Sequence, residues 1–557
     1  MKRPASPEPL VDLEAPSTSH DMDRCNNNNN AERKPRAASL ARLASHKLVL
    51  VALLAAVFVM SAVVITLSTS ELLQLNVFRG VKTSLDMEAT QDVSSNDEEK
   101  ERGKEREKEK EKEKLNYELE KAHRAAQLRI EQFTKQLQKA KMHREIALSL
   151  SHYAHRTTAP RGIVLPLFDD IALLGMSIIL ELRALQVDLP IEIPHCGDLK
   201  PEFQHLLQSK DANVRVYNIC LQAQAATNVF GSGKKLFCGN MKNCHYRFRG
   251  FHIKILATIF SQFEEVMLVD ADTIFFQNPM QLWESEKYKT TGTLFFHDRI
   301  SSSDDFLAER VSNTTEGQKI SMLHKYLSTF DVTPFELLVN IPRAEATVKN
   351  AMPVQLPFKA SDFLLSSHSW NLRAGHEMDS SLVLWNKSKQ PRATAILASF
   401  ISRNGISFPP SYGDKELFFL ACELAETEYA FSDFGVGSLG SDLHADGDTP
   451  NSVLCGGGLH YLPTATPGMK DVQPLYLNSD DILTLDVVNS ALYRTLARPA
   501  DFYAGSFIEK DLPQECPFGI TALQLSADEK QTIARRQALY KETLVWMQER
   551  RAPNISI

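Results

Sequence analysis

The chain has 557 residues, of which 43% are hydrophobic and 24% are charged, and its formal net charge at pH 7 is −7. This length exceeds one ordinary domain, and the composition is that of a globular protein with added tails or spacers. The negative net charge gives no general attraction to nucleic acid, and eight cysteines are too few for a scaffold built on disulfides. We therefore expect no nucleic-acid partner, and a folded domain that carries at most a few disulfide bridges.

The first predicted elements are a tail and a membrane anchor. Residues 1–47 are rich in Pro, Ser and Asn, which predicts a disordered tail. Residues 48–67 contain no charged side chain, and a helix of that length spans about 30 Å, the thickness of a bilayer core. A buried core helix would show a polar face, and a cleaved signal peptide would have a shorter apolar region and a shorter lead. A transmembrane signal anchor is the better interpretation.

The flanking charges predict the orientation of this anchor. Residues 31–47 carry five basic side chains against one acid, whereas few basic residues directly follow the anchor. Because positive residues stay cytosolic, we expect a single-pass type II protein with a luminal C-terminal part. Three N-glycosylation sequons, at Asn313, Asn386 and Asn554, would then lie on the luminal side.

A luminal stalk is predicted over residues 68–154. Acidic and basic residues alternate through 97–114, a composition that cannot bury a core and indicates a solvated spacer. Apolar residues then recur at spacings of three and four, which is typical of a coiled-coil seam. The seam consists of Leu115, Leu119, Ala122, Ala126, Ile130, Phe133, Leu137 and Ala140. It could pair two chains into a homodimer or dock on the folded domain.

The folded domain is expected over residues 155–557. Short apolar runs bounded by Gly or Pro predict strands at 161–166, 189–193 and 214–217, with a helix at 171–185 between the first two. A last helix is expected between about 527 and 551. Alternating strands and helices predict an α/β domain with a largely parallel sheet and flanking helices.

The most informative segment ends a continuously apolar stretch, residues 266–269, with Asp270-Ala271-Asp272. Such a stretch predicts a central strand covered on both faces, and ligands of open α/β sheets bind beyond the carboxyl ends of the strands. Burying two carboxylates there is costly unless a cation compensates them. Carboxylate and phosphate oxygens suit a hard cation, so we expect Asp270 and Asp272 to hold Mn²⁺ or Mg²⁺, with Asp270 also available to a donor ribose.

A phosphatase that uses Asp-x-Asp-Thr after an apolar strand is the rival interpretation, with the first Asp as nucleophile and the second as general acid. Asp270-Ala-Asp-Thr273 fits that pattern. Such an enzyme would also need a later Gly-Asp-x-x-x-Asp cluster. The best candidate begins at Gly413-Asp414, but it has Phe418 where the second Asp is required. We therefore rank a metal-dependent transferase above it.

Residues 234–254 carry six Lys or Arg side chains and no acid, with aromatic residues between them. This pattern could form a cradle for a phosphate or a nucleotide, with Lys254 as the residue that contacts it. The alternative is a solvated basic loop closed by a Cys238–Cys244 bridge.

Six blocks in order resemble the fungal α-1,3-mannosyltransferases that extend cell-wall and glycoprotein mannans. They lie between about residues 160 and 460 and leave out the tail and stalk. The blocks are residues 161–166, 254–272, 291–299, 377–387, 412–424 and 455–460. The resemblance implies a GT-A fold, a GDP-mannose donor, retention of the anomeric configuration, a mannose-containing glycan as acceptor and residence in the Golgi membrane.

The resemblance also assigns residues. His460 would be the third metal ligand, although an ordinary loop histidine is the alternative. The run around Gly457 would let the backbone approach the donor phosphates. Asp379 and Asp414 are expected in the sugar pocket as catalytic residues, with a plain turn and a helix N-cap as their respective alternatives. A UDP-sugar donor and a non-catalytic Golgi coiled-coil scaffold are the alternatives for the function.

Overall fold

The computed structural model describes residues 97–551, apart from 301–304, 313–318, 349–351, 404–407, 443–451, 464–471 and 501–517. The predicted tail (1–47), the predicted anchor (48–67) and the first part of the predicted stalk lie outside the described residues. Within the described part, no helix is long and apolar enough to cross a membrane. The membrane anchor therefore stays a prediction. Contacts divide the chain into two units between Ala122 and His123.

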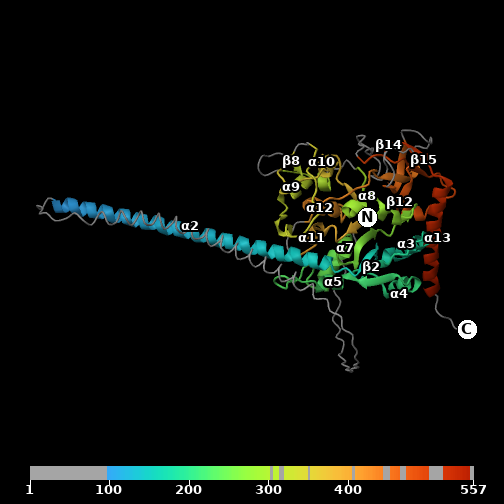
Figure 1. Cartoon of the computed structure of the whole chain (residues 1–557), viewed down its shortest axis with the longest axis horizontal. Coiled ribbons are helices and arrows are strands. Elements are labelled where there is room, and N and C mark those ends of the chain that lie inside the picture. The colour runs from blue at the N-terminus through green and yellow to red at the C-terminus, as the bar shows by residue number, and fades with distance from the viewer. Residues whose placement is uncertain are drawn as a thin grey trace, which may run out of the picture. The chain divides into compact units, whose positions relative to one another are not determined.

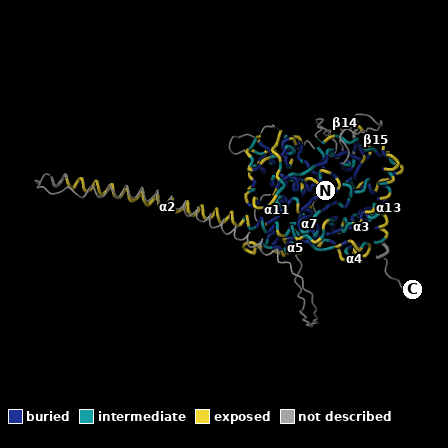
Figure 2. Tube along the Cα trace, viewed as in Figure 1, coloured by how far each residue is buried: buried dark blue, intermediate teal, exposed yellow. Residues whose placement is uncertain are grey.

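Most of the predicted stalk forms one helix, α2 (Asp97–Ala154). The charged run is helical, and its residues 101–114 are exposed. Residues 101–142 of α2 are exposed (Figure 2), including seam residues such as Ile130 and Phe133, whose exposed fractions are 66% and 61%. The last turns of α2, with Ile146, Leu150 and Ala154, are buried in the core of the second unit. The seam is thus a helical stripe open to a partner.

Six strands form the central sheet of the second unit, in the order β3-β2-β1-β4-β9-β6. They are β1 (Ala159–Val164), β2 (Ile191–His195), β3 (Val214–Asn218), β4 (Phe263–Val269), β6 (Thr293–His297) and β9 (Met378–Asn386). The strands β1 to β4 pair in parallel, and β9 runs antiparallel to both β4 and β6. The prediction of an α/β domain with a largely parallel sheet is confirmed, with β9 as the one strand of this sheet that runs the other way.

Both faces of this sheet are covered, as the apolar run in β4 predicted. Val266 and Leu268 pack in one core, and Met267 and Val269 pack in a second core on the opposite face. The first core also takes α5 (Ile219–Ala225), α6 (Met241–Phe248), α7 (Ile253–Phe260), α9 (Met322–Thr329), α10 (Asp362–Ser366), α11 (Pro391–Phe400) and α12 (Leu417–Leu424). The second takes α3 (Ala172–Ala184), α4 (Pro201–Lys210) and α8 (Glu286–Thr291) (Figure 1).

A second, antiparallel sheet was not predicted. Its strands are β5 (Thr273–Phe275), β10 (Gly437–Asp442), β11 (Ser452–Tyr461), β12 (Pro474–Asn478), β13 (Tyr493–Thr495) and β15 (Ala522–Gln524), with β14 (Phe518–Ile520) paired to β11. The last helix, α13 (Ala527–Arg551), confirms the predicted C-terminal helix and packs on α3. A short hairpin, β7 (Arg310–Ser312) and β8 (Lys319–Ser321), lies apart from both sheets.

Two disulfides join Cys196 to Cys220 and Cys238 to Cys244, and the second closes the basic segment as the alternative interpretation anticipated.

One of the three N-glycosylation sequons, at Asn386, lies within the described residues. Asn386 ends β9, is only 7% exposed, and its side chain accepts the Lys389 N–H, so it is closed to glycosylation. Asn313 and Asn554 lie outside the described residues.

Candidate active site

The loop that carries Asp270 and Asp272 joins the two sheets. It leaves β4 at Val269 and enters β5 at Thr273. Two backbone hydrogen bonds fix it: the Asp270 N–H donates to the Ser381 carbonyl of β9 at 2.8 Å, and the Ser479 N–H donates to the Asp272 carbonyl at 3.1 Å. Both carboxylates therefore stand where the central sheet, β9 and the end of β12 meet.

Lys254 at the start of α7 is tied to these acids. Its Nζ lies 2.7 Å from Oδ1 and 2.8 Å from Oδ2 of Asp270, and 3.8 Å from Oδ1 of Asp414. Burial raises the pKa of Asp270 to about 7, against the opposing effect of Lys254. Burial would lower the pKa of Lys254, but the carboxylates of Asp270 and Asp414 outweigh it and raise that pKa, so the lysine is charged. The residue predicted to meet a phosphate is thus a fixed cation at the site.

Asp379 of β9 is held from two sides. Its Oδ2 lies 2.9 Å from Nε2 of His460, and its Oδ1 accepts the Ser381 N–H at 2.8 Å. His460 is 1% exposed and its ring stacks on Tyr476, with 4.5 Å between ring centroids. Although burial acts to raise the pKa of Asp379, its bond to His460 and the charge of Lys415 bring that pKa well below its usual range. Asp379 is therefore a rigid, ionised carboxylate.

The structure does not bring His460 together with Asp270 and Asp272 as a three-residue metal site. No group of three or more His, Cys, Asp or Glu side chains that could hold a metal ion is found among the described residues. The reason is the local packing of His460, which turns its Nε2 toward Asp379 instead. The predicted role of His460 as a metal ligand remains a prediction.

Asp414 lies between Gly413 and α12. It is 1% exposed, and burial is the largest effect that raises its pKa. It stands three residues before α12, and the capping residue of that helix is Glu416, so the N-cap alternative does not describe it. Oδ2 of Asp414 is buried with no hydrogen-bond partner within the described structure. Asp414 lines the cavity described below, and a carboxylate is suited to accept a hydrogen bond from a ligand hydroxyl.

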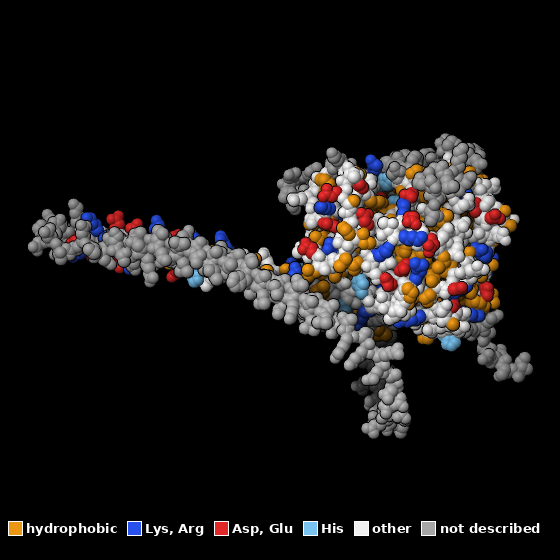
Figure 3. All heavy atoms as spheres, in the orientation of Figure 1, with side chains coloured by type: hydrophobic (Ala, Val, Ile, Leu, Met, Phe, Trp, Pro, Cys, Tyr) orange, Lys and Arg blue, Asp and Glu red, His pale blue; other side chains and the backbone are white. Residues whose placement is uncertain are grey.

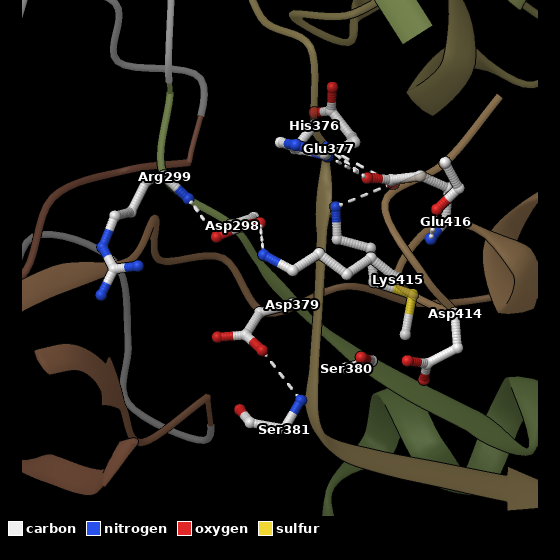
Figure 4. Close-up of polar contacts among 12 residues, drawn as sticks. Asp298, Arg299, His376, Glu377, Asp379, Ser380, Ser381, Asp414, Lys415 and Glu416 are labelled. Atoms are coloured by element: carbon white, nitrogen blue, oxygen red, sulfur yellow. Dashed lines mark hydrogen bonds and ion pairs between the residues drawn. The ribbon is translucent and has the colours of Figure 1, made fainter. Parts of the chain in front are cut away.

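Sequence analysis missed an ion pair at this site, between Asp298 and Lys415. Figure 4 shows Lys415 reaching Asp298, with Asp379 beside them. The Arg299 N–H donates to Oδ1 of Asp298 at 2.8 Å, and the Asp298 N–H donates to the Glu377 carbonyl at 3.0 Å. Both residues fall inside blocks that carried the resemblance. The sequence indicated only that each is a charged residue, one directly after the strand β6 and one shortly before the helix α12.

The site consists of two adjoining cavities, here called the polar lobe and the apolar lobe. The polar lobe, of about 170 Å³, is lined by charged and polar side chains that include Asp298, Asp379, Asp414 and Lys415. The apolar lobe, of about 330 Å³, is lined mainly by Pro166, Leu167, Phe168, Ile171, Leu174 and Ile253, with Asp198, Asp272 and Asp480. Phe251, Lys254 and Asp270 line both. The lobes therefore meet at the lysine–aspartate pair, and a ligand with an apolar ring at one end and a hydroxylated group at the other would fit across it.

Gly457 lies in a strand, and its predicted role beside the donor phosphates remains a prediction. The glycines occupy the middle of β11, and a Cβ on Gly457 would lie 2.4 Å from Cβ of Ser479. The neighbouring Gly458 is the one that lines the polar lobe. The glycines thus allow close packing of β11 against β10 and β12, and the backbone that faces the cavity is that of Gly458.

A buried ion pair supports the acidic loop from the C-terminal helix. Nη2 of Arg536 in α13 donates to the Ala271 carbonyl at 2.9 Å, and Oε2 of Glu181 in α3 accepts the Phe275 N–H at 3.3 Å. Nε of Arg536 lies 3.6 Å from Oε2 of Glu181, and both side chains are 0% exposed. The two ends of the segment 271–275 are therefore held by one pair of side chains.

The folded domain is similar to known proteins over much of its length. Residues 160–459 match the model of a family described as "Mannosyltransferase putative". A stretch of 302 residues is 27% identical to the Candida albicans protein named "Putative alpha-1,3-mannosyltransferase MNN1", covering 50% of this chain and 33% of that protein. The alpha-1,3-mannosyltransferase MNT2 of Saccharomyces cerevisiae is 24% identical over 286 residues, covering 50% of this chain and 45% of its own length. The chain thus spans between a third and a half of the length of these relatives.

Among solved structures, the galactosyltransferase LgtC in complex with donor and acceptor sugar analogs is 12% identical, covers 49% of this chain and 74% of its own, and gives a TM-score of 0.25. An overlap at this TM-score carries no argument about the fold.

The segment that matches the family model, residues 160–459, contains Lys254, Asp270, Asp298, Asp379 and Asp414, all residues of the polar lobe.

Proposed function

Because the chain belongs to the mannosyltransferase family whose model it matches over residues 160–459, we propose that it transfers mannose from GDP-mannose to a mannose-containing glycan. The observation that carries this proposal is the pair of adjoining lobes. A nucleotide sugar has a flat aromatic base, a ribose, a charged diphosphate and a hydroxylated sugar in that order. The apolar lobe, the Lys254–Asp270 junction and the polar lobe offer surfaces of matching character in the same order.

A divalent cation fits the acidic loop. Burial raises the pKa values of both Asp270 and Asp272, so the ionised pair gains from a nearby positive charge. Mg²⁺ is often bound through one or two carboxylates together with substrate phosphates, so a third protein ligand is not required. Since Lys254 already contacts both oxygens of Asp270, Asp272 would be the main ligand. The bound Mn²⁺ or Mg²⁺ would neutralise charge on the leaving diphosphate.

The polar lobe would orient the sugar. The free Oδ2 of Asp414 would accept a hydrogen bond from a sugar hydroxyl, and the Asp298–Lys415 pair supplies further donors and acceptors. Asp379 remains ionised, so its charge would stabilise the positive charge that develops on the anomeric carbon. Two routes give retention: a sugar–carboxylate intermediate, for which Asp379 is the candidate, or same-face displacement in which the diphosphate takes the proton of the acceptor.

The remaining parts of the proposal rest on the sequence. We interpret the central sheet with its acidic loop after β4 as a GT-A-type domain. The protein would be a type II membrane protein of the Golgi, and the seam on α2 would pair two chains as a homodimer. The names of the relatives support an α-1,3 linkage.

Transfer by the purified full-length chain tests the proposal. It would receive GDP-mannose, UDP-glucose, UDP-galactose or UDP-GlcNAc, with Mn²⁺ and a mannose-terminated oligosaccharide. Asp272→Asn is the test variant, and Asp188→Asn, at an exposed position outside the cavity, is its matched control. We expect metal-dependent transfer from GDP-mannose that Asp272→Asn abolishes and Asp188→Asn keeps. Transfer from a UDP-sugar would overturn the donor, and no transfer or donor hydrolysis by folded protein would overturn the enzyme.

A further inference from the structure

A separate cavity of about 490 Å³ borders the polar lobe. It shares no lining residue with either lobe of the site. The two spaces are nevertheless neighbours along the chain. His297 lines the separate cavity, and the next residue, Asp298, lines the polar lobe. Likewise, Glu377 lines the separate cavity and Asp379 lines the polar lobe. The ends of β6 and β9 therefore carry lining residues of both cavities.

Aromatic rings form much of the lining of this cavity. The rings of Phe363 and Phe431 are stacked, with 4.2 Å between centroids and 11° between planes. The His297 ring lies 4.8 Å from that of Phe431, and the Tyr429 ring lies 5.7 Å from that of Phe363. Flat ring faces provide an apolar surface that suits the C–H face of a pyranose.

Polar groups stand around these rings. Nζ of Lys287 lies 2.5 Å from Oδ1 of Asp433 and 2.7 Å from the Phe431 carbonyl, and the two charged side chains are 34% and 40% exposed. Deeper in the cavity, Glu377 is 4% exposed, and its Oε2 accepts hydrogen bonds from the N–H and hydroxyl of Ser369. Carboxylates accept hydrogen bonds and lysine donates them, so both kinds of partner for hydroxyl groups are present.

The charges of the cavity argue against an anionic ligand. Lys287 is neutralised by Asp433, and burial lowers the pKa of His297 to about 3, so that ring is neutral at physiological pH. Glu377 adds an acid, and it interacts with His368, the remaining histidine of the lining. A phosphate or an acidic peptide would find no net positive charge here. The ligand favoured by the lining is neutral, hydroxylated and apolar on one face.

We propose that this cavity binds hexose units of the acceptor glycan, beyond the unit whose hydroxyl receives the transferred sugar. The proposal rests on the proposed function for the identity of the glycan. Its position supports the assignment, because an acceptor must present a hydroxyl at the polar lobe while its other units lie nearby. The volume is within the range of about 300–1,000 Å³ that small-molecule sites occupy.

Binding of glycans by the full-length chain tests this site without requiring turnover. An α-linked mannotetraose and methyl α-mannoside would be titrated into wild type, Phe363→Leu and Lys287→Met, with GDP and Mn²⁺ present. Lys289→Met is the matched control, because Lys289 lies on the same helix, pairs with Glu284 at 3.1 Å and does not line the cavity. Thermal melting would confirm that each variant folds, and the partly exposed Lys287 keeps the test available if Phe363→Leu is unstable.

We expect wild type to bind the tetraose at least tenfold more tightly than the monosaccharide. Phe363→Leu and Lys287→Met should each weaken tetraose binding at least fivefold, and Lys289→Met should change it less than twofold. Equal affinity of wild type for both glycans, or wild-type affinity for the tetraose in folded variants, would overturn the site. Hydrolysis of GDP-mannose by wild type reports separately on the proposed function.

Discussion

Replacing Arg536 with methionine tests how the loop that carries Asp270 and Asp272 is held in place. Methionine keeps an unbranched apolar side chain but removes the guanidinium that donates to the Ala271 carbonyl and lies beside Glu181. Arg536 lies in α13, outside the segment that matches the family model. Arg536 lines neither lobe, so any effect of this substitution on the donor site would act through the loop that it holds or through its charge near Asp272.

The expected loss of stability follows from the buried groups that lose their partner when Arg536 is replaced. Removing one partner of a buried ion pair costs about 3–5 kcal/mol, because the other charge stays buried. The orphaned Ala271 carbonyl falls within that cost, since an unpaired buried group alone costs about 1–3 kcal/mol. Burial already raises the pKa of Glu181 to about 7 against the opposing charge of Arg536, so without Arg536 this carboxyl should be neutral at pH 6. The loss of stability should then be smaller at pH 6 than at pH 8.

Urea unfolding at pH 6 and pH 8, with titration of GDP in Mn²⁺, measures both consequences. The neighbouring Arg535→Met, at an exposed position on the same helix, is the control. We expect Arg536→Met to lower the free energy of unfolding by about 3–5 kcal/mol at pH 8 and to raise the Kd for GDP about tenfold, which corresponds to ~1.4 kcal/mol. A loss below about 1 kcal/mol, or lost stability with an unchanged Kd for GDP, would refute the role of this pair in supporting the loop.

Three further predictions concern single positions. Lys254→Met leaves the buried Asp270 and Asp414 without their cation, so the free energy of unfolding should fall by about 3–5 kcal/mol. GDP binding should also be lost. Normal GDP affinity would contradict the role of Lys254 where the two lobes meet. Burial lowers the pKa of Lys387 to about 7. Between pH 7 and the ordinary lysine pKa of about 10.4, the unfolded state binds a proton that the folded state has released. The free energy of unfolding of wild type should therefore rise with pH relative to that of Lys387→Met. Parallel profiles of unfolding free energy from pH 7 to 9 would contradict this. Finally, Ile130→Asp together with Phe133→Asp should convert a dimer to a monomer in sedimentation equilibrium, and an unchanged mass would exclude the seam as the dimer contact.

Local patterns were enough to predict one layer of the fold. The strands β1, β2 and β4 and the helix α3 follow from apolar runs with clear Gly, Pro or charged boundaries, and these runs are largely buried as expected. The position of Asp270 and Asp272 was predictable for the same reason, because the buried strand β4 ends directly before them. These features depend on residues that are close together in the chain.

The second sheet could not be predicted in this way. Its strand β5 has three residues and pairs with β12, in which Tyr476 lies opposite Phe275. Such a pairing is decided by contacts between distant segments and leaves little local pattern. The same applies to the glycines of β11, whose close packing against β10 and β12 was not predicted from the sequence.

The site shows the same division. Asp298 and Lys415 form an ion pair only because the end of β6 meets the segment before α12, and neither segment indicates its partner. The orientation of His460 depends on stacking against Tyr476 and on its contact with Asp379, which spacing in the sequence does not specify. Residue types indicated which side chains carry chemistry, and tertiary packing decides which of them face one another.

The most direct test of the two-lobed site is a crystal structure of the full chain with GDP-mannose and Mn²⁺. The account predicts that the guanine lies in the apolar lobe beside Phe168, the diphosphate and metal lie at Lys254 and Asp272, and the mannose lies in the polar lobe against Asp414. A nucleotide bound outside these lobes, or a mannose that does not contact the polar lobe, would contradict it.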